Sequence, residues 1–469
     1  MSTKFISLES MNIIGTISQY HTVVGLLMVF WLIWLFVKRQ YNKKRIVIPS
    51  DDEIEEKLAA WHPDPLVPEP NEDHPSLKLK LVSKHNGKRI TVNDKNCLNL
   101  GTHNYLGLSD NKLIEENAVA AIKKYGVGSC GPRGFYGTFD VHLELEESIA
   151  KFMNVEEAIL YSYGFCTVSS AISAYCKKRD IVFADEKVNF AIQKGLDASR
   201  SSVRYFKHND IKHLECMLEE QAVIDNKNPK KASKIRRFLI IEGIYMNTGL
   251  VCPLPELVAL CRKYKLRIFI DESISIGTLG DTGRGVTEHF GVPGHEIDMF
   301  IGSLEWAFGS IGGFCAGSSF IIEHQRLSGL GYCFSASLPP LLTVAAISAI
   351  KMISEDQSLI EKLRENCLNI QSRLGNLKNF ELSATPESPV KHLYLKNKYD
   401  RLEEQKLLSS ISEKCIENNL AVTLPAYLDV ERDLPRPSLR LCISSLLDES
   451  DIDFVITTLN KYSEDILYQ

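Results

Sequence analysis

Short apolar runs alternate with longer amphipathic stretches through the middle of the chain. Between residues 155 and 325 the runs are rich in β-branched and aromatic side chains, and the stretches between them have helical spacing. This alternation is typical of strands and helices that build a mainly parallel sheet covered on both faces. The pattern therefore predicts an α/β fold with strands in six runs: Ala158–Tyr161, Ile181–Ala184, Val203–Phe206, Phe238–Ile241, Arg267–Ile270 and Met299–Ile301.

The last part of the chain repeats the alternation on a smaller scale. An amphipathic stretch over residues 341–377 predicts one long helix, and a smaller α/β region follows it. We therefore expect a large domain over residues 85–340, then the long helix and a small C-terminal domain over residues 341–469. The small domain is expected to contain three strands, at 392–395, 421–423 and 438–443, and two helices, at 403–418 and 449–462.

The N-terminal region has a different pattern. Residues 13–37 contain no charged side chain, and a basic cluster follows at residues 38–45. A helix of this length, rising about 1.5 Å per residue, crosses roughly 30 Å of hydrocarbon with a tilt, and the positive-inside rule puts the rest of the chain in the cytoplasm. We predict a membrane anchor over residues 1–45 with a transmembrane helix at about 13–37. A signal peptide is disfavoured because no cleavage site follows, and a buried soluble helix is the other alternative.

Residues 46–84 are polar and rich in proline, with four prolines between residues 63 and 70. Prolines at this density exclude regular helix and favour an extended, semi-rigid chain. We therefore predict that this segment is a strap between the anchor and the large domain.

Composition narrows the classes of function. The chain has 469 residues, of which 44% are hydrophobic and 24% are charged, and its formal net charge is -5. That charge, without a basic patch interleaved with aromatic residues, excludes general nucleic-acid binding. The twelve cysteines form no CxxC pair and no His/Cys spacing suited to zinc. We therefore predict reduced thiols in the cytosol and no metal site.

Three segments carry candidate chemistry. The run that ends in Asp271 places a carboxylate at the end of a buried strand, where α/β sheets bind ligands. Residues 126–138 combine five glycines with a proline, an arginine and two aromatic residues, so their backbone can approach another group closely. The turn at residues 163–165 precedes a predicted helix whose free N–H groups would suit a phosphate, and an ordinary strand-to-helix turn explains it equally well.

These segments, in this order, resemble the α-oxoamine synthase family of pyridoxal-phosphate enzymes. The resemblance also includes residues 98–108, 242–255, 283–286 and 331–340, and it extends from about residue 85 to the C-terminus. It implies a fold-type I pyridoxal-phosphate transferase architecture. It also implies chemistry in which an amino acid is joined to an acyl-CoA with loss of carbon dioxide.

The resemblance also shows which family residues are replaced. The lysine that carries the cofactor as a Schiff base is matched by Trp306, and no lysine occurs between residues 265 and 351. The histidine that stacks on the cofactor ring is matched by Asn189, and the histidine beside the cofactor hydroxyl by Ile274. Asp271, which pairs with the pyridinium nitrogen in the family, persists. Indole has no basic nitrogen for a Schiff base, so the chain alone is predicted to be inactive.

Family members are dimers whose active sites lie at the subunit interface. The resemblance therefore implies an obligate heterodimer with a lysine-bearing catalytic subunit, which binds pyridoxal phosphate covalently. It implies an endoplasmic reticulum membrane location and small regulatory membrane proteins as further partners. This chain would contribute half of the interface and groups that reach the partner's active site, for which the candidates are Cys130, Arg133, Tyr136, Ser335 and Ser337.

Several alternatives stay open. Arg440 matches an arginine that lies near the substrate carboxylate in the family, and without a cofactor we expect it to form a structural salt bridge. Asp271 favours some residual cofactor affinity, or it has a structural use such as capping a helix or pairing with Arg284. The whole chain is either a non-catalytic subunit, a self-sufficient transferase that uses an unrelated lysine, or a membrane-tethered regulatory scaffold without an enzymatic partner.

Overall fold

The computed structural model describes residues 22–38, 50–67, 77 and 79–468, and the chain divides into two compact units, residues 1–72 and 73–469. In the first unit, residues 22–38 are helical with exposed side chains. Within the described residues, no helix combines the length and the apolar character that a bilayer crossing requires. The predicted span starts at residue 13, so its first part lies outside the described residues.

A second helix in this unit corrects the prediction of an extended strap. Helix α2 spans Asp51–Ala60. Ser50 and Glu53 form a capping box, in which Ser50 Oγ accepts from the Glu53 N–H (3.3 Å) and the Glu53 carboxylate accepts from the Ser50 N–H (3.1 Å). No proline interrupts α2, and the dense prolines start only at residue 63. The prolines therefore exclude regular helix only after α2, where residues 61–67 are not helical.

A seven-stranded sheet forms the centre of the second unit, in the order β4-β10-β9-β8-β7-β5-β6. Neighbours among β5 to β9 pair in parallel, whereas β10 is antiparallel to both of its neighbours. Every predicted apolar run forms a strand of this sheet, and β10 is the strand of this sheet that the pattern did not predict. The strands are β4 (Glu157–Tyr161), β5 (Ile181–Asp185), β6 (Ser202–Phe206), β7 (Arg237–Glu242), β8 (Arg267–Asp271), β9 (Met299–Ser303) and β10 (Gly313–Gly317).

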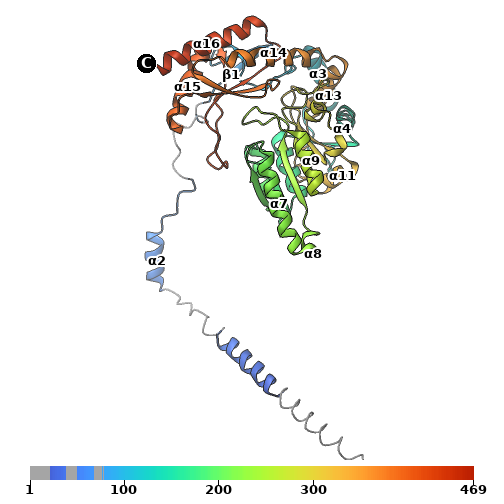
Figure 1. The fold of residues 1–469 in the computed structure, drawn as a ribbon, viewed down its shortest axis with the longest axis vertical. Coiled ribbons are helices and arrows are strands. Elements are labelled where there is room, and N and C mark those ends of the chain that lie inside the picture. The colour runs from blue at the N-terminus through green and yellow to red at the C-terminus, as the bar shows by residue number, and fades with distance from the viewer. Residues whose placement is uncertain (1–21, 39–49, 68–76, 78, 469) are drawn as a thin grey trace, which may run out of the picture. The chain divides into compact units, whose positions relative to one another are not determined.

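Helices pack on this sheet and on one another. Helix α5 (Gly164–Tyr175) follows β4 in the chain and contacts β9, β10 and α6 (Phe190–Ser199). Helix α13 (Pro340–Glu355) packs against α3 and α4, which lie together in Figure 1. The others are α3 (Lys112–Tyr125), α4 (Asp140–Met153), α7 (Ile211–Lys227), α8 (Pro229–Ala232), α9 (Leu254–Tyr264), α10 (Val286–Phe290), α11 (Ser319–Ser328) and α12 (Leu330–Cys333).

The predicted helix over residues 341–377 is two helices. Helix α13 spans Pro340–Glu355 and α14 spans Ser358–Leu374. Asp356 leaves the helical conformation, and its carboxylate accepts from the N–H and the hydroxyl of Ser358, each at 2.9 Å. A short polar side chain that binds nearby backbone competes with the helix, and the amphipathic spacing continues across the break.

Two smaller sheets complete the second unit. Helices α14, α15 (Arg401–Glu417) and α16 (Glu449–Leu467) gather around them in Figure 1. Strand β3 pairs in parallel with β13 through Leu98 and Leu420, so segments from both ends of this unit share one sheet. The first sheet contains β1 (Val82–Asn86), β2 (Arg89–Val92), β3 (Lys95–Asn99) and β13 (Leu420–Ala421), and the second contains β11 (Phe380–Ser383), β12 (Val390–Leu395) and β14 (Leu439–Cys442).

One hydrophobic core runs through this unit. Phe269 on β8, Leu98 on β3 and Leu459 on α16 belong to the same buried cluster, so the large and small sheets are packed together. The cysteines all fall within the described residues as free thiols, and most are buried. Their burial agrees with the prediction that most of them lie in the core.

Candidate functional site

A cavity of about 400 Å³ lies where the parallel strands end and the smaller sheet meets the large one. Asp271 ends β8, Asn189 precedes α6 and Trp306 follows β9, and all three line the cavity. Arg440 on β14 lines it from the three-stranded sheet. Three of the four positions at which family cofactor residues are expected therefore come together at one site.

Ile274, the fourth of these positions, lies elsewhere. It is 2% exposed and packs in the hydrophobic core. It is not among the residues that line the cavity. Ile274 therefore contributes apolar packing behind the site.

The carboxylate of Asp271 is satisfied within the chain. Its Oδ1 accepts from the N–H (3.0 Å) and the hydroxyl (2.5 Å) of Ser273, and its Oδ2 accepts from Nδ2 of Asn189 (2.9 Å). Asn189 also caps α6, because its Oδ1 accepts the N–H of Ile192 (3.1 Å). Among the described residues, the partners of Asp271 do not include Arg284, so that suggested pairing is wrong.

A second buried acid lies beside Asp271 and Asn189. Glu242 ends β7, and its carboxylate accepts the N–H groups of Asn189 (2.7 Å) and Met246 (2.9 Å). Burial, followed by repulsion from Asp271, raises the pKa of Glu242 to about 8. Burial also raises the pKa of Asp271. The two buried carboxyl groups are therefore each harder to ionise than a carboxyl group in water.

The side chain of Trp306 is held by an aromatic contact. Its indole stacks on the imidazole of His103, with ring centroids 4.8 Å apart and an interplanar angle of 28°. The Nδ1 atom of His103 lies 2.6 Å from the Tyr105 hydroxyl, and burial lowers the pKa of His103 well below its usual value. Sequence reasoning assigned no role to His103, although it belongs to the family-like segment 98–108.

The N-terminus of α5 is capped by a carboxylate from another part of the chain. Oε1 of Glu305 accepts the Gly164 N–H at 3.1 Å, and the N-cap residue Tyr163 makes no side-chain cap. A negative charge at this end of a helix is favourable. The first N–H of the turn at residues 163–165 is therefore already bound by a carboxylate of this chain. Sequence reasoning missed Glu305, although it directly precedes Trp306.

Pyridoxal phosphate does not fit the residues of this cavity. Covalent capture needs an amine where Trp306 has an indole. The ring nitrogen needs a free carboxylate, and Asp271 already accepts three hydrogen bonds. A phosphate would meet the carboxylate of Glu305 at the end of α5. No chemical step of the family reaction therefore follows from this chain's own cavity.

The expected salt bridge of Arg440 is not formed within the described residues. Its Nη1 donates to the sulfur of Met246 (3.5 Å), and its Nε is buried without an acceptor. Tyr427 lines the same cavity, and its hydroxyl is likewise buried without a partner. The prediction of a structural ion pair for Arg440 is therefore wrong.

The candidate residues for partner contact lie in two segments that bind each other, the glycine loop (residues 126–138) and residues 335–338. The Ser337 N–H donates to the Gly131 carbonyl (3.0 Å), and the Ser337 hydroxyl donates to the Gly137 carbonyl (2.5 Å). The two groups of candidates, far apart in the sequence, therefore form one structural unit.

Within this unit the five candidates differ. Arg133 is buried, and its guanidinium binds both oxygens of Glu146 (2.8 and 3.2 Å). Ser337 is buried and Ser335 is half-buried, whereas Cys130 and Tyr136 are exposed. Cys130 and Tyr136 also have positive φ angles of 57° and 63°. Non-glycine residues adopt such angles at a cost, and often at functional sites.

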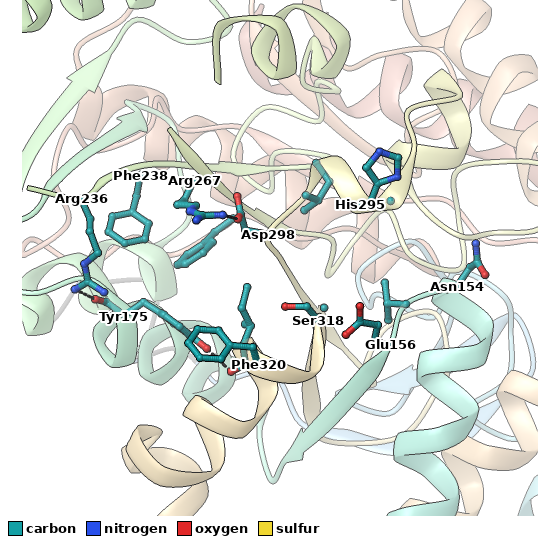
Figure 2. Close-up of a pocket in the computed structure, with 16 residues that line it drawn as sticks. Asn154, Glu156, Tyr175, Arg236, Phe238, Arg267, His295, Asp298, Ser318 and Phe320 are labelled. Carbon is teal, nitrogen blue, oxygen red and sulfur yellow. Dashed lines mark hydrogen bonds and ion pairs between the residues drawn. The ribbon is translucent and has the colours of Figure 1, made fainter. Parts of the chain in front are cut away.

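A second cavity, of about 670 Å³, lies at the opposite edge of the sheet, where β7, β8 and β9 begin. Figure 2 shows Arg267 beside Asp298, at 2.7 Å, and Arg236 at the carbonyl oxygen of Tyr175, at 2.8 Å. None of the predicted site residues lines it. Both arginines are already engaged within the chain, so the cavity at the other edge remains the candidate site.

Comparison with known proteins identifies relatives of this chain. The family model "Aminotransferase class I and II" matches residues 95–459. Serine palmitoyltransferase 1 of Dictyostelium discoideum is 40% identical over 454 residues, which cover 94% of this chain and 93% of that protein. Long chain base biosynthesis protein 1 of Arabidopsis thaliana is 39% identical over 449 residues, covering 95% and 91%.

More distant proteins extend the comparison. Serine palmitoyltransferase 1 of Saccharomyces cerevisiae is 32% identical over 486 residues, covering 92% of this chain and 87% of that protein. A solved serine palmitoyltransferase from S. paucimobilis with bound PLP-myriocin aldimine has a TM-score of 0.76 at 24% identity, covering 89% and 98%. That structure supports the fold. Since the family model covers most of the second unit and the relatives match nearly the whole chain, this protein belongs to the aminotransferase class I and II family, in the group of serine palmitoyltransferase 1 and long chain base biosynthesis protein 1.

Proposed function

We propose that this chain is a non-catalytic but required subunit of a serine palmitoyltransferase. This enzyme condenses L-serine with palmitoyl-CoA to 3-ketosphinganine, the first step of sphingolipid synthesis. The names of its relatives support the reaction. The observation that carries the non-catalytic role is Trp306, which stacks on His103 at the position where the family has its cofactor lysine.

In this proposal the partner is a lysine-bearing subunit of the same fold, which binds pyridoxal phosphate. The chain contributes the unit formed by the glycine loop and residues 335–338. Arg133 and Ser337 hold this unit together from inside, since both are buried and hydrogen-bonded within the chain. Cys130 and Tyr136 are exposed on it, and we assign the contact with the partner's active site to them.

We also propose that the N-terminal region holds the enzyme on the endoplasmic reticulum membrane, with the second unit in the cytosol. The support is the apolar helical segment over residues 22–38, in which Phe30, Trp31 and Trp34 are 74%, 57% and 50% exposed. Large exposed apolar side chains of this kind mark a surface that contacts a membrane or another protein. Retention of the full chain in the membrane pellet after alkaline extraction, and its release when residues 1–45 are removed, would bear this out.

The test of the function is co-purification of the full chain with the lysine-bearing subunit. We expect the pair to turn over serine and palmitoyl-CoA, and each chain alone to be inactive. The isolated chain should show no aldimine absorption after incubation with pyridoxal phosphate. A covalent adduct on this chain, or turnover without a partner, would overturn the non-catalytic role.

The same experiment addresses the scaffold alternative. A membrane-tethered scaffold without an enzymatic partner would bring down no pyridoxal-phosphate enzyme from its own cells. Recovery of a lysine-bearing subunit in equal amount supports the heterodimer, and its absence supports the scaffold.

A further inference from the structure

Glu305 takes part in the site in a way that the missing lysine does not explain. Its Oε1 accepts the Gly164 N–H at 3.1 Å, and its own N–H donates to Ser303 Oγ at 3.0 Å. A Cβ on Gly164 would lie 3.4 Å from this Oε1 and 3.1 Å from Ser303 Oγ. The carboxylate, the serine and the first residue of α5 are therefore closely packed together.

This contact gives the helix end a negative charge that the helix itself lacks. Helix α5 has no acidic residue in its first turn, and Tyr163 provides no side-chain cap. The N-terminus of a helix carries partial positive charge and free N–H groups, which bind anions. Gly164, Phe165 and Glu305 all line the cavity. The helix end that faces the cavity is therefore already supplied with an anion.

We infer that Glu305 is a built-in anion that excludes phosphorylated ligands from this cavity, independently of the missing lysine. The inference rests on the proposed function, in which the cavity is not a cofactor site of this chain. A phosphate carries about -1.5 to -2 charges near neutral pH. It would have to displace the carboxylate from the Gly164 N–H or lie beside its charge, and each is unfavourable. Trp306 thus blocks the covalent bond, and Glu305 blocks the phosphate.

The test compares two ligands that differ only in the phosphate, pyridoxal phosphate and pyridoxal. The proteins are the full chain with Trp306→Lys and the full chain with Trp306→Lys and Glu305→Gln, each purified without a cofactor-binding partner. Aldimine absorption gives the affinities, and borohydride trapping with mass mapping confirms the adduct at position 306. Removal of one charge beside a phosphate should raise the affinity for pyridoxal phosphate about tenfold or more. The affinity for pyridoxal should change by less than about twofold, because it has no phosphate to repel.

Two further variants make the comparison specific. Glu305→Ser in the Trp306→Lys background removes the charge with a shorter side chain, and serves if the glutamine variant fails to fold. Glu431→Gln in the Trp306→Lys background is the matched control, because Glu431 lines the same cavity and its carboxylate accepts the Leu428 N–H rather than an N–H of α5. This control should leave both affinities unchanged.

The outcomes separate this inference from the proposed function. Equal gains for both ligands, no gain for pyridoxal phosphate, an equal effect of Glu431→Gln, or no adduct in either double variant would each overturn the role of Glu305. Cofactor capture by the unaltered chain would instead contradict the proposed function, and the comparison between the two ligands would stand.

Discussion

At the scale of single residues, a buried ion pair between Arg133 and Glu146 joins the glycine loop to α4. Their side chains are 4% and 7% exposed. Loss of one partner leaves the other charge buried and unpaired, which costs about 3–5 kcal/mol. We expect Arg133→Met to lower the free energy of unfolding by about 3 kcal/mol or more, measured by chemical denaturation.

The control for this prediction is the exposed pair between Lys124 and Asp140, whose side chains are each 65% exposed. Lys124→Met should change stability little, because water screens this pair. Equally small changes in the two variants would show that Arg133 does not hold the loop.

The buried acids make stability depend on pH. Burial is the largest cause that raises the pKa of Glu242 from 4.5 to about 8 and that of Glu272 to about 7. The unfolded chain loses these protons at lower pH than the folded chain. The contribution of these two groups to the free energy of unfolding is therefore greatest below about pH 4.5. It is lost as the pH rises through about 7 to 8.

Glu242→Gln removes the larger of these titrations. We expect the melting temperature of the variant to fall less steeply between about pH 5 and pH 8 than that of the unaltered chain. Thermal unfolding at several pH values measures this, with the exposed Glu256→Gln as the control. Parallel curves for Glu242→Gln and the unaltered chain would contradict the assignment.

At the scale of elements, the glycine loop combines backbone strain with exposure at Tyr136. This residue has a φ of 63° and a fully exposed side chain. Glycine adopts such a φ without strain, so Tyr136→Gly should leave stability unchanged or raise it by about 1 kcal/mol. If the tyrosine contacts the partner, turnover of the co-purified enzyme should fall about tenfold, as for other interface aromatic residues.

A matched control exists in the hairpin between β2 and β3. Asp94 is exposed and has a φ of 64°. Asp94→Gly therefore removes the same kind of backbone strain outside the glycine loop. It should leave turnover intact. Full activity of Tyr136→Gly would remove Tyr136 from the proposed partner contact.

At the scale of the whole molecule, strands from the first and the last part of the second unit pair with each other, as β3 and β13. Leu98 on β3 is 0% exposed and lies in the core shared by the large and small sheets. Leu98→Ala leaves a cavity in that core, which costs about 2–5 kcal/mol. We expect a loss of about 3 kcal/mol in a single unfolding transition, followed by circular dichroism and tryptophan fluorescence.

The control is Leu113→Ala on α3, where the side chain is 53% exposed. Its effect should be small, because little apolar area leaves a buried site. Two separate transitions in Leu98→Ala would mean that the small sheets unfold independently of the large one.

Much of the large domain could be predicted from the sequence because its signals are local. Each buried strand is a short apolar run, and all six predicted runs form strands. The residues of the α2 capping box are also visible in the sequence, but the nearby prolines led to the prediction of an extended strap. The break at Asp356 was hidden, because the side chain that ends α13 contacts the backbone only once the turn has formed.

The fold class, the tryptophan at position 306 where the family has a lysine, and the carboxylate of Asp271 at a strand end could all be inferred from the order of residues. What those groups can do depends on the folded structure. Asn189 and Ser273 satisfy Asp271, Glu305 caps α5, and Arg440 lacks the acidic partner that was expected among the described residues. The reason is physical. Chain order sets which residues can enter a strand, whereas the partners and charge state of a buried polar group depend on residues that folding brings from distant segments.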